Sequence, residues 1–178
     1  MRRLNPVPVS FRIPMCLVAT SALAACTGTG MQRSYDALSL ESRSGSSVNG
    51  TMRFSEHSGK LRLRGTVRGL APGSEHGFHI HEKGDCSAAD ASSAGGHFNP
   101  GASAHGSRSA AIHHAGDLPS LKADAKGVAK IDVMLEGVTL ADGPTSIRSR
   151  SLVVHGKADD FTTQPSGNSG PRVACGVI

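Results

Sequence analysis

Nine histidines are the residues of this 178-residue chain best suited to chemistry. Imidazole is the most common metal ligand in proteins and suits both zinc and copper. His79 and His81 lie two positions apart in a run, His76 to Lys83, that predicts a β-strand. Because side chains alternate along a strand, both imidazoles would project from one face and could reach one metal ion. By itself this pair fits a metal site or two exposed strand histidines equally well.

A denser set of potential ligands follows in a stretch that has no regular periodicity. It comprises three imidazoles and one carboxylate: His97, His105, His114 and Asp117. Four such ligands complete a tetrahedral shell with no open position, which is typical of a structural zinc site. A flexible loop that is only rich in histidine is the alternative. His113 competes with His114 for one position, and the three-residue step to Asp117 favours His114.

Short strands must position these residues. The chain has 22 glycines, which indicate many tight turns, and only 3% aromatic residues, which leave no large aromatic core. Strands are predicted where short apolar or alternating runs lie between turn signals: residues 35–43, 48–56, 61–67, 76–83, 117–124, 128–135, 151–155 and 172–178. About eight short strands predict an all-β sandwich or barrel. Two long irregular loops, Gly84 to Ala115 and Lys157 to Pro171, are expected to be functional.

The N-terminal segment is interpreted as an export signal. Two arginines precede an apolar run over residues 13–25, which is shorter than the about 20 residues that a membrane-spanning helix needs. Leu23-Ala24-Ala25-Cys26 resembles the lipobox of bacterial lipoproteins. That resemblance implies a signal peptide at 1–25, a lipidated Cys26 and a flexible tether to residue 34. An ordinary signal peptide with a chance cysteine is the alternative.

Export sets the expected location and the chemistry of the remaining cysteines. The chain is expected in the periplasm, anchored by lipid to a bacterial membrane, and Thr27 after the cysteine favours the outer membrane. Cys16 lies in the discarded run, so Cys86 and Cys175 are left in an oxidising compartment, where a disulfide is expected. Two separate buried thiols are the alternative.

The net charge of +5 does not indicate a nucleic-acid partner. Three of the basic residues, Arg2, Arg3 and Arg12, lie in the export segment. The rest of the chain has no basic run interleaved with aromatic residues, which is the usual footprint of nucleic-acid binding. No nucleic-acid partner is therefore expected.

The residues around the histidines match a known family in long, ordered segments. These segments are Gly77-Phe78-His79-Ile80-His81-Glu82, Gly84-Asp85-Cys86, Gly96-His97-Phe98-Asn99-Pro100, His105, His114-Ala115-Gly116-Asp117-Leu118, Leu152-Val153-Val154-His155, Ala158-Asp159-Asp160 and Arg172-Val173-Ala174-Cys175-Gly176-Val177-Ile178. They resemble the copper,zinc superoxide dismutases over residues 35–178. The resemblance implies an eight-stranded antiparallel Greek-key barrel.

The resemblance also implies a role for each candidate residue. Copper would be held by His79, His81, His97 and His155, and zinc by His97, His105, His114 and Asp117. His97 would bridge both ions, and Asp159 would accept hydrogen bonds from one ligand of each, His79 and His105. Arg172 would attract and orient the substrate anion, and a Cys86–Cys175 disulfide would tie the long loop to the last strand.

The implied activity is superoxide dismutase. Superoxide would be converted to oxygen and hydrogen peroxide by alternate reduction and oxidation of copper, with His97 and Arg172 as the catalytic residues. The family contains both dimers and monomers, so the oligomeric state, including a homodimer, stays open. One departure from eukaryotic members is the second loop, because residues 161–171 carry no charged side chain to steer the anion.

Two other functions use the same residues. A non-enzymatic extracytoplasmic copper-binding protein would buffer copper without turnover, and the presence of every copper ligand and of Arg172 argues for the enzyme instead. An interaction domain stapled by zinc alone would not need His79, His81 and His155.

Overall fold

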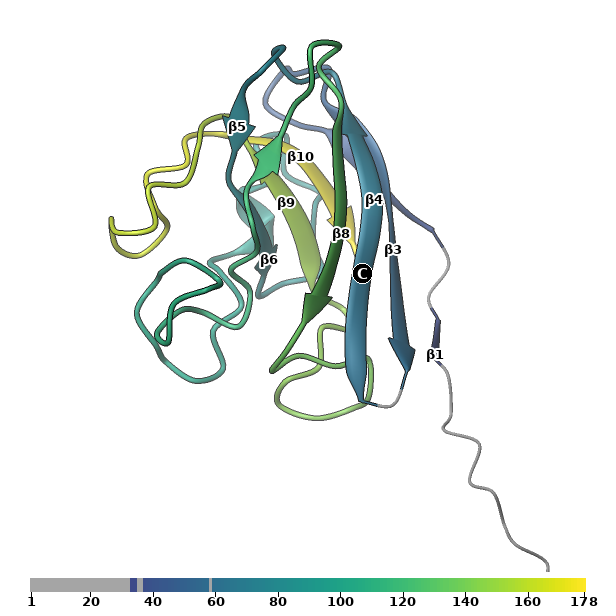
Figure 1. Ribbon diagram of the computed structural model, residues 1–178, viewed down its shortest axis with the longest axis vertical. Helices are drawn as coiled ribbons and strands as arrows, with labels where there is room; N and C mark the ends of the chain where they lie inside the picture. Colours follow the sequence, from purple (N-terminus) through teal and green to yellow (C-terminus); the bar gives the residue numbers. More distant parts are fainter. Residues whose placement is uncertain (1–32, 35–36, 58) are drawn as a thin grey trace, which may run out of the picture.

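The computed structural model describes residues 33–34, 37–57 and 59–178 (Figure 1). Its elements are β1 (Arg33–Ser34), β2 (Leu38–Ser42), β3 (Asn49–His57), β4 (Lys60–Arg68), β5 (Glu75–His76), β6 (Phe78–His81), the 3-10 helix η1 (Ser92–Ala94), β7 (Leu121–Lys122), β8 (Ala129–Leu135), β9 (Ser151–His155) and β10 (Arg172–Val177). The prediction of an all-β fold is confirmed. The predicted signal peptide and Cys26 lie outside the described residues, and none of the described helices is long and apolar enough to cross a membrane.

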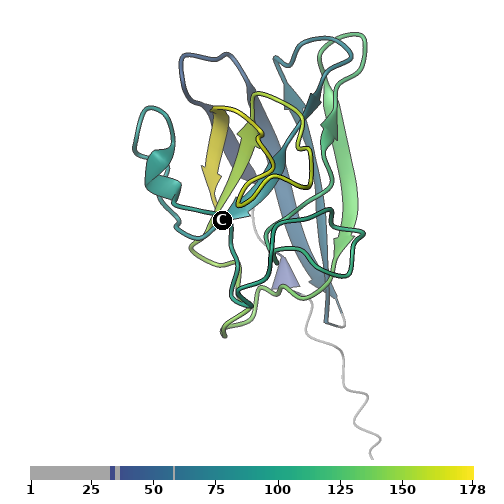
Figure 2. The ribbon, with the colours of Figure 1, turned by 90° about the vertical axis from the view of Figure 1, so that its left-hand side faces the viewer.

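The strands form one curled antiparallel sheet. Its order is β6-β9-β10-β2-β3-β4-β8, and β1 pairs with β3. Figures 1 and 2 show two layers, with β3, β4 and β8 in one and β6, β9 and β10 in the other. The short β5–β7 pair links the two end strands of the sheet, because β5 leads into β6 and β7 leads into β8. The sheet is thereby closed toward a barrel.

Alternating side chains place the core between the two layers. In β4, Leu61, Leu63 and Val67 are buried, whereas Arg62 and Arg64 point outward and are exposed. The opposite layer contributes inward-facing residues to the same core: Phe78, Ile80, Leu152 and Val154. Burial of such side chains contributes about 1.5–3 kcal/mol each.

Two predicted strands are shorter than expected, and both differences serve the site. The strand predicted at 76–83 is divided at Gly77, where an added Cβ would crowd Ser169 Oγ at 2.6 Å and His79 Cε1 at 3.1 Å. The strand predicted at 117–124 is reduced to β7. Pro119 has no N–H to donate to a ladder, and Asp117 forms only an isolated bridge with His79.

Candidate metal centre

The outer face of two adjacent strands carries three of the predicted ligands. β6 and β9 pair with His79 opposite Val153 and His81 opposite Ser151. Because Phe78 and Ile80 point into the core, the alternating histidines point outward. His155 ends β9 near them, and all three histidines are buried although they lie outside the barrel. The two long loops must therefore cover them.

The loop after β6 returns along the free edge of that strand and delivers His97. Phe98 N donates to Ile80 O at 2.8 Å, and His97 forms a bridge with His81. A third segment joins at Gly116, whose N–H donates to Phe98 O at 2.8 Å. A Cβ at Gly116 would collide with Ile80 O and stand 3.0 Å from Phe98 N, so only glycine permits this approach. The approach places Asp117 beside the histidines.

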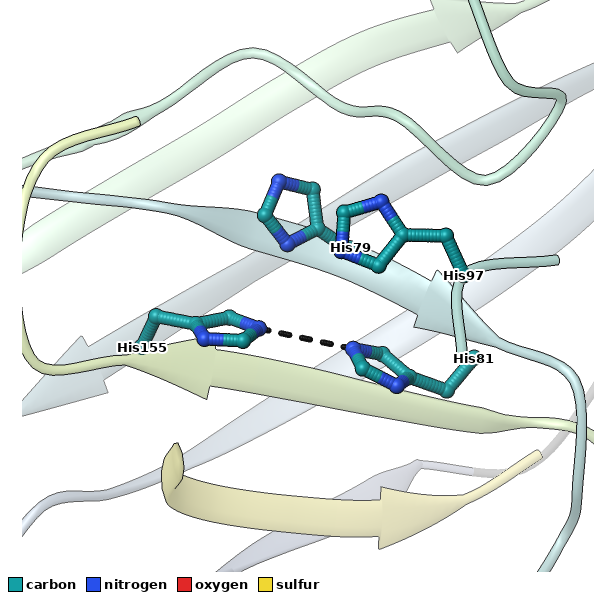
Figure 3. A group of neighbouring side chains, drawn as sticks. All are labelled: His79, His81, His97 and His155. Atoms are coloured by element: carbon teal, nitrogen blue, oxygen red, sulfur yellow. Dashed lines mark hydrogen bonds between the residues drawn. The ribbon is translucent and has the colours of Figure 1, made fainter. Parts of the chain in front are cut away.

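The first group, here called the four-histidine set, is formed by His79, His81, His97 and His155 (Figure 3). One nitrogen of each ring lies within 4.8 Å of the other three. His79 Nδ1 and His97 Nε2 are buried and have no hydrogen-bond partner among the described residues. His81 Nε2 and His155 Nε2 face each other at 3.4 Å, the contact drawn in Figure 3.

Hydrogen bonds on the outer side of these rings show which nitrogens are free. His81 Nδ1 donates to Gly95 O at 3.0 Å, and His155 Nδ1 donates to Gly170 O at 3.3 Å. A neutral imidazole has one N–H, so both Nε2 atoms carry lone pairs. Two such lone pairs facing each other in a buried site repel unless a cation lies between them. The four-histidine set therefore fits a metal ion that prefers imidazole ligands.

Burial keeps these rings in the form that binds a metal. Desolvation, reinforced by the neighbouring His97 and His155, lowers the pKa of His79 well below its usual value. His81 is shifted in the same direction by the same causes. Desolvation, opposed by the bond to Gly170 and reinforced by His97, lowers the pKa of His155 to about 4. These three rings are neutral at pH 7 and offer lone pairs.

The second group, here called the aspartate set, is formed by His97, His105, His114 and Asp117, and all four are buried. Asp117 Oδ1 lies 2.9 Å from His97 Nδ1 and 3.1 Å from His105 Nδ1. His114 Nδ1 lies 3.3 Å from His97 Nδ1. His97 thus presents Nδ1 to this set and Nε2 to the other. His114, rather than His113, joins the set, because His113 turns its Nδ1 to the His114 carbonyl at 2.7 Å.

Asp117 is held as a carboxylate. Burial alone would raise its pKa, but the bond with His97 and those from the backbone N–H groups of His114 and Gly106 hold the pKa well below its usual value. A buried carboxylate against three imidazole nitrogens is the donor set of a closed zinc site.

Asp159 connects the two sets from the second loop. Its Oδ2 accepts from His79 Nε2 at 2.7 Å, and its Oδ1 accepts from His105 Nε2 at 3.0 Å. Both bonds use Nε2, so Nδ1 of His79 and Nδ1 of His105 each face their own ligand set. Orienting ligand rings in this way is the usual role of an outer carboxylate. Gly167 packs against this carboxylate with a φ of +68°. A side chain there would collide with Asp159 Oδ1.

An open pocket of about 430 Å³ gives access to the four-histidine set, and its lining includes His81, His97, His155 and Arg172. Arg172 is paired with His155 in the β9–β10 register, and the register shifts immediately after it. Such a bulge re-aims a side chain. The Arg172 guanidinium donates to Ala91 O and Gly95 O, both at 2.6 Å. It therefore stands in the pocket in a fixed orientation.

A sequence model of the family described as Copper/zinc superoxide dismutase (SODC) matches residues 48–178. The chain belongs to the copper/zinc superoxide dismutase family. The expected cofactors, copper and zinc, agree with the family and with the two ligand sets.

Relatives in this family come from distant organisms. The chain is 41% identical over 140 residues to an extracellular superoxide dismutase [Cu-Zn] of Brugia pahangi, covering 74% of this chain and 69% of that one. It is 38% identical over 135 residues to superoxide dismutase [Cu-Zn] 2 of Aquifex aeolicus, covering 74% and 79%. The crystal structure of an SOD-like protein from Bacillus subtilis matches with a TM-score of 0.73 and 35% identity, covering 82% and 99%.

The predicted disulfide is present in this member of the copper/zinc superoxide dismutase family. Cys86 and Cys175 are bonded, with their Cα atoms 5.8 Å apart and a sequence separation of 89. Cys86 lies in the loop that supplies the Ala91 and Gly95 carbonyls, and Cys175 lies in β10 three residues after Arg172. The disulfide therefore joins the strand that bears Arg172 to the loop whose carbonyls accept its hydrogen bonds.

One residue that positions the metal centre was not predicted from the sequence. The side-chain amide of Gln164 makes two hydrogen bonds with the backbone of His105. His105 N donates to Gln164 Oε1 at 2.8 Å, and Gln164 Nε2 donates to His105 O at 3.0 Å. Gln164 ties the second loop to the aspartate set at a point close to Asp159. A glutamine in a polar loop carries no local signal of such a role.

Replacing Asp159 by asparagine should weaken metal binding in both sets. An amide can accept from only one of the two imidazole N–H groups, and its NH₂ would oppose the other. Loss of an outer partner costs about 10- to 100-fold in metal affinity. Competition with a chelator, followed separately for copper and zinc, measures the change. Asp160→Asn is the matched control, because the Asp160 carboxylate accepts hydrogen bonds only from Thr162 and Thr163 among the described residues. Equal affinities in the two variants would contradict the role of Asp159.

Proposed function

We propose that this protein is an enzyme that converts two superoxide anions and two protons to oxygen and hydrogen peroxide. The observation that carries the proposal is the open pocket, in which a fixed guanidinium stands beside a metal set built only from imidazoles. A site that only stored a metal ion would not need a cation held at its mouth.

The donor chemistry supports the assignment of each metal. The four-histidine set suits copper, which binds imidazole strongly. The aspartate set, closed and tetrahedral in type, suits a structural zinc. His97 belongs to both sets through different nitrogens, as a bridging ligand must. Copper, when bound, supplies the one-electron couple that superoxide can reduce and oxidise in turn.

The residues of the chain supply attraction, orientation and a proton. Arg172 attracts the anion and orients it in the pocket, and both of its carbonyl bonds keep it in place. His97 Nε2 faces the four-histidine set, so this ring atom can hold one of the two protons that the peroxide product needs. Water reaching the open pocket supplies the other. Nδ1 of His97 belongs to the aspartate set, so it keeps the orientation of the ring fixed while Nε2 gains and loses the proton.

The location is proposed from the sequence and is supported by the relatives. One relative is named as extracellular, and another comes from a bacterium. We propose a periplasmic protein anchored to the bacterial membrane through a lipid on Cys26, at the end of a signal peptide at 1–25. The mass of the mature N-terminal peptide tests this anchor.

The decisive experiment measures metal content and superoxide decay on the same preparation. One copper and one zinc per chain with rapid decay are expected. Full copper loading with superoxide decay no faster than that of the metal-free protein would contradict the proposal. A non-enzymatic copper-binding protein would then be the function, an alternative favoured by the match to a protein that is named only SOD-like.

Replacing Arg172 by glutamine should slow superoxide decay without removing copper. The guanidinium donates to the carbonyls of Ala91 and Gly95 rather than to a candidate metal ligand, so copper content should stay at the wild-type value. Decay should fall by about tenfold or more and lose most of its dependence on salt, because steering of an anion by charge gains about 10- to 1,000-fold in association rate. Arg172→Lys should recover part of the rate, since it keeps the charge but not both carbonyl bonds. If the Arg172→Gln variant consumed superoxide as fast as the wild type at low salt, the proposed role of Arg172 in the mechanism would be wrong.

A further inference from the structure

The outer face of the layer opposite the metal centre is strongly basic. Six exposed residues of β3, β4 and β8 form it, and they are called here the basic face: Arg53, Lys60, Arg62, Arg64, Arg68 and Lys130. Among the described outward positions of these three strands, Asp132 is the one carboxylate. An ordinary solvated sheet face mixes charges of both signs. This one does not.

The arrangement costs stability that the sheet does not recover internally. Arg53 lies directly opposite Arg64 in the β3–β4 register, and like charges in that position repel. Asp132 pairs with Arg62 at 2.6 Å and with Arg64 at 3.3 Å, so one carboxylate serves two cations. The other four basic residues have no ion-pair partner within the described part of the chain. Five of the six charges do not protect a sheet edge, because β3 and β4 are interior strands and only Lys130 lies on the end strand β8.

The basic face and the metal pocket point in opposite directions. Phe54 and Leu63 cover the inner side of the basic layer, and Ile80 and Leu152 cover the inner side of the other layer, within one core. The two outer faces must then lie on opposite sides of the barrel, as Figures 1 and 2 show. A partner seated on the basic face would leave the pocket open.

The start of the fold connects the basic face to the proposed anchor. β1 pairs with the far end of β3, Arg33 with Glu56 and Ser34 with Ser55, and Figure 1 shows β1 beside β3. The segment from Cys26 to Arg33, fully extended, reaches at most about 25 Å. A lipid on Cys26 would therefore hold the β3 side of the domain close to the bilayer, within reach of headgroup charge.

We propose that the basic face lies against a bilayer that contains anionic phospholipid. This inference rests on the lipid anchor proposed above and is independent of the dismutase chemistry. The headgroup phosphates supply negative counter-charges for Arg53, Arg68, Lys60 and Lys130. Each basic residue near such a surface raises the affinity for the membrane on the order of fivefold. The pocket with Arg172 then faces away from the membrane, open to superoxide in solution.

Amine labelling on vesicles tests the orientation within one molecule. The full chain, expressed in a bacterium with its own N-terminal segment and purified as the cell processes it, is inserted into vesicles of phosphatidylcholine alone or with one third phosphatidylglycerol. Lys60 and Lys130 report on the basic face, and Lys157, exposed in the second loop, reports on the pocket side. Mass spectrometry then gives the acetylation rate of each lysine.

The anionic vesicles should slow acetylation of Lys60 and Lys130 by at least fivefold and leave Lys157 unchanged, and added salt should reverse the protection. The double variant Arg53→Gln with Arg68→Gln should lose most of the protection. Arg148→Gln, which replaces an exposed arginine in the segment before β9, should keep it.

Equal acetylation rates in both kinds of vesicle, protection of Lys157 instead, or a purified chain without lipid would each overturn the proposal. So would protection by a soluble polyanion, such as duplex DNA, that the vesicles do not give.

Superoxide decay on the same vesicles separates this result from the proposed activity. Protection of the two lysines without decay would leave the membrane orientation standing and remove only the enzyme.

Discussion

Replacing His97 by alanine should lower the content of both metals in one step. His97 is the one residue that belongs to both ligand sets, with Nε2 in the four-histidine set and Nδ1 in the aspartate set. The loss of affinity should exceed the about 10- to 100-fold that loss of an outer partner causes, because a direct ligand is removed from each site. Superoxide decay should fall to the level of the metal-free protein. Metal analysis after dialysis against a weak chelator measures the result.

His155→Ala is the matched comparison. His155 belongs only to the four-histidine set, so its variant should lose copper and keep zinc. The fold should survive in both variants, because these histidines point away from the hydrophobic core. If His97→Ala lost only one metal, the bridging role would be wrong, and the two sites would be independent.

Removing the disulfide should produce the largest loss of stability. Replacing Cys86 and Cys175 together by alanine opens a cross-link between residues 89 apart in the sequence. In the chain-entropy account, a loop of this length contributes about 4–5 kcal/mol, and native disulfides typically contribute about 2–5 kcal/mol. Alanine suits both positions because both cysteines are buried. Denaturant unfolding of the metal-free protein measures the free energy.

The disulfide variant should also lose the ordered position of Arg172. The loop that bears Ala91 and Gly95 is joined to β10 through Cys86, so its carbonyls are expected to drift from the guanidinium once the bond is gone. Salt dependence of superoxide decay should then weaken toward that of Arg172→Gln. A variant with unchanged stability and unchanged salt dependence would show that the loop is held by its other contacts, such as the bond from Arg43 Nε to Cys86 O at 2.9 Å.

The grouping of the candidate ligands could be predicted from the sequence because strand geometry is local. The two-residue step from His79 to His81 already requires a common face, and the structure brings both rings together with His97 and His155. The choice of His114 over His113 followed from its spacing to Asp117 and from the family resemblance, and His114 is the ring that the structure places in the aspartate set.

The contacts between loops could not be predicted from the sequence in the same way. Gln164 and Gly167 act on His105 and Asp159 through tertiary contacts, and neither residue carries a periodic or charged signal. The strand expected at 117–124 is reduced to two residues because the backbone N–H of Asp117 donates to His114 O in a turn, at 3.1 Å, rather than to a neighbouring strand. Local strand patterns do not report such competition.

The two faces of β6 and β9 have separate tasks, and this separation has an evolutionary consequence. Phe78, Ile80, Leu152 and Val154 complete the core from one face, while the histidines occupy the other. Substitutions among the ligands can therefore accumulate by drift without unfolding the barrel. A lineage could exchange its metals, or abandon them and acquire another role, and still inherit the same scaffold.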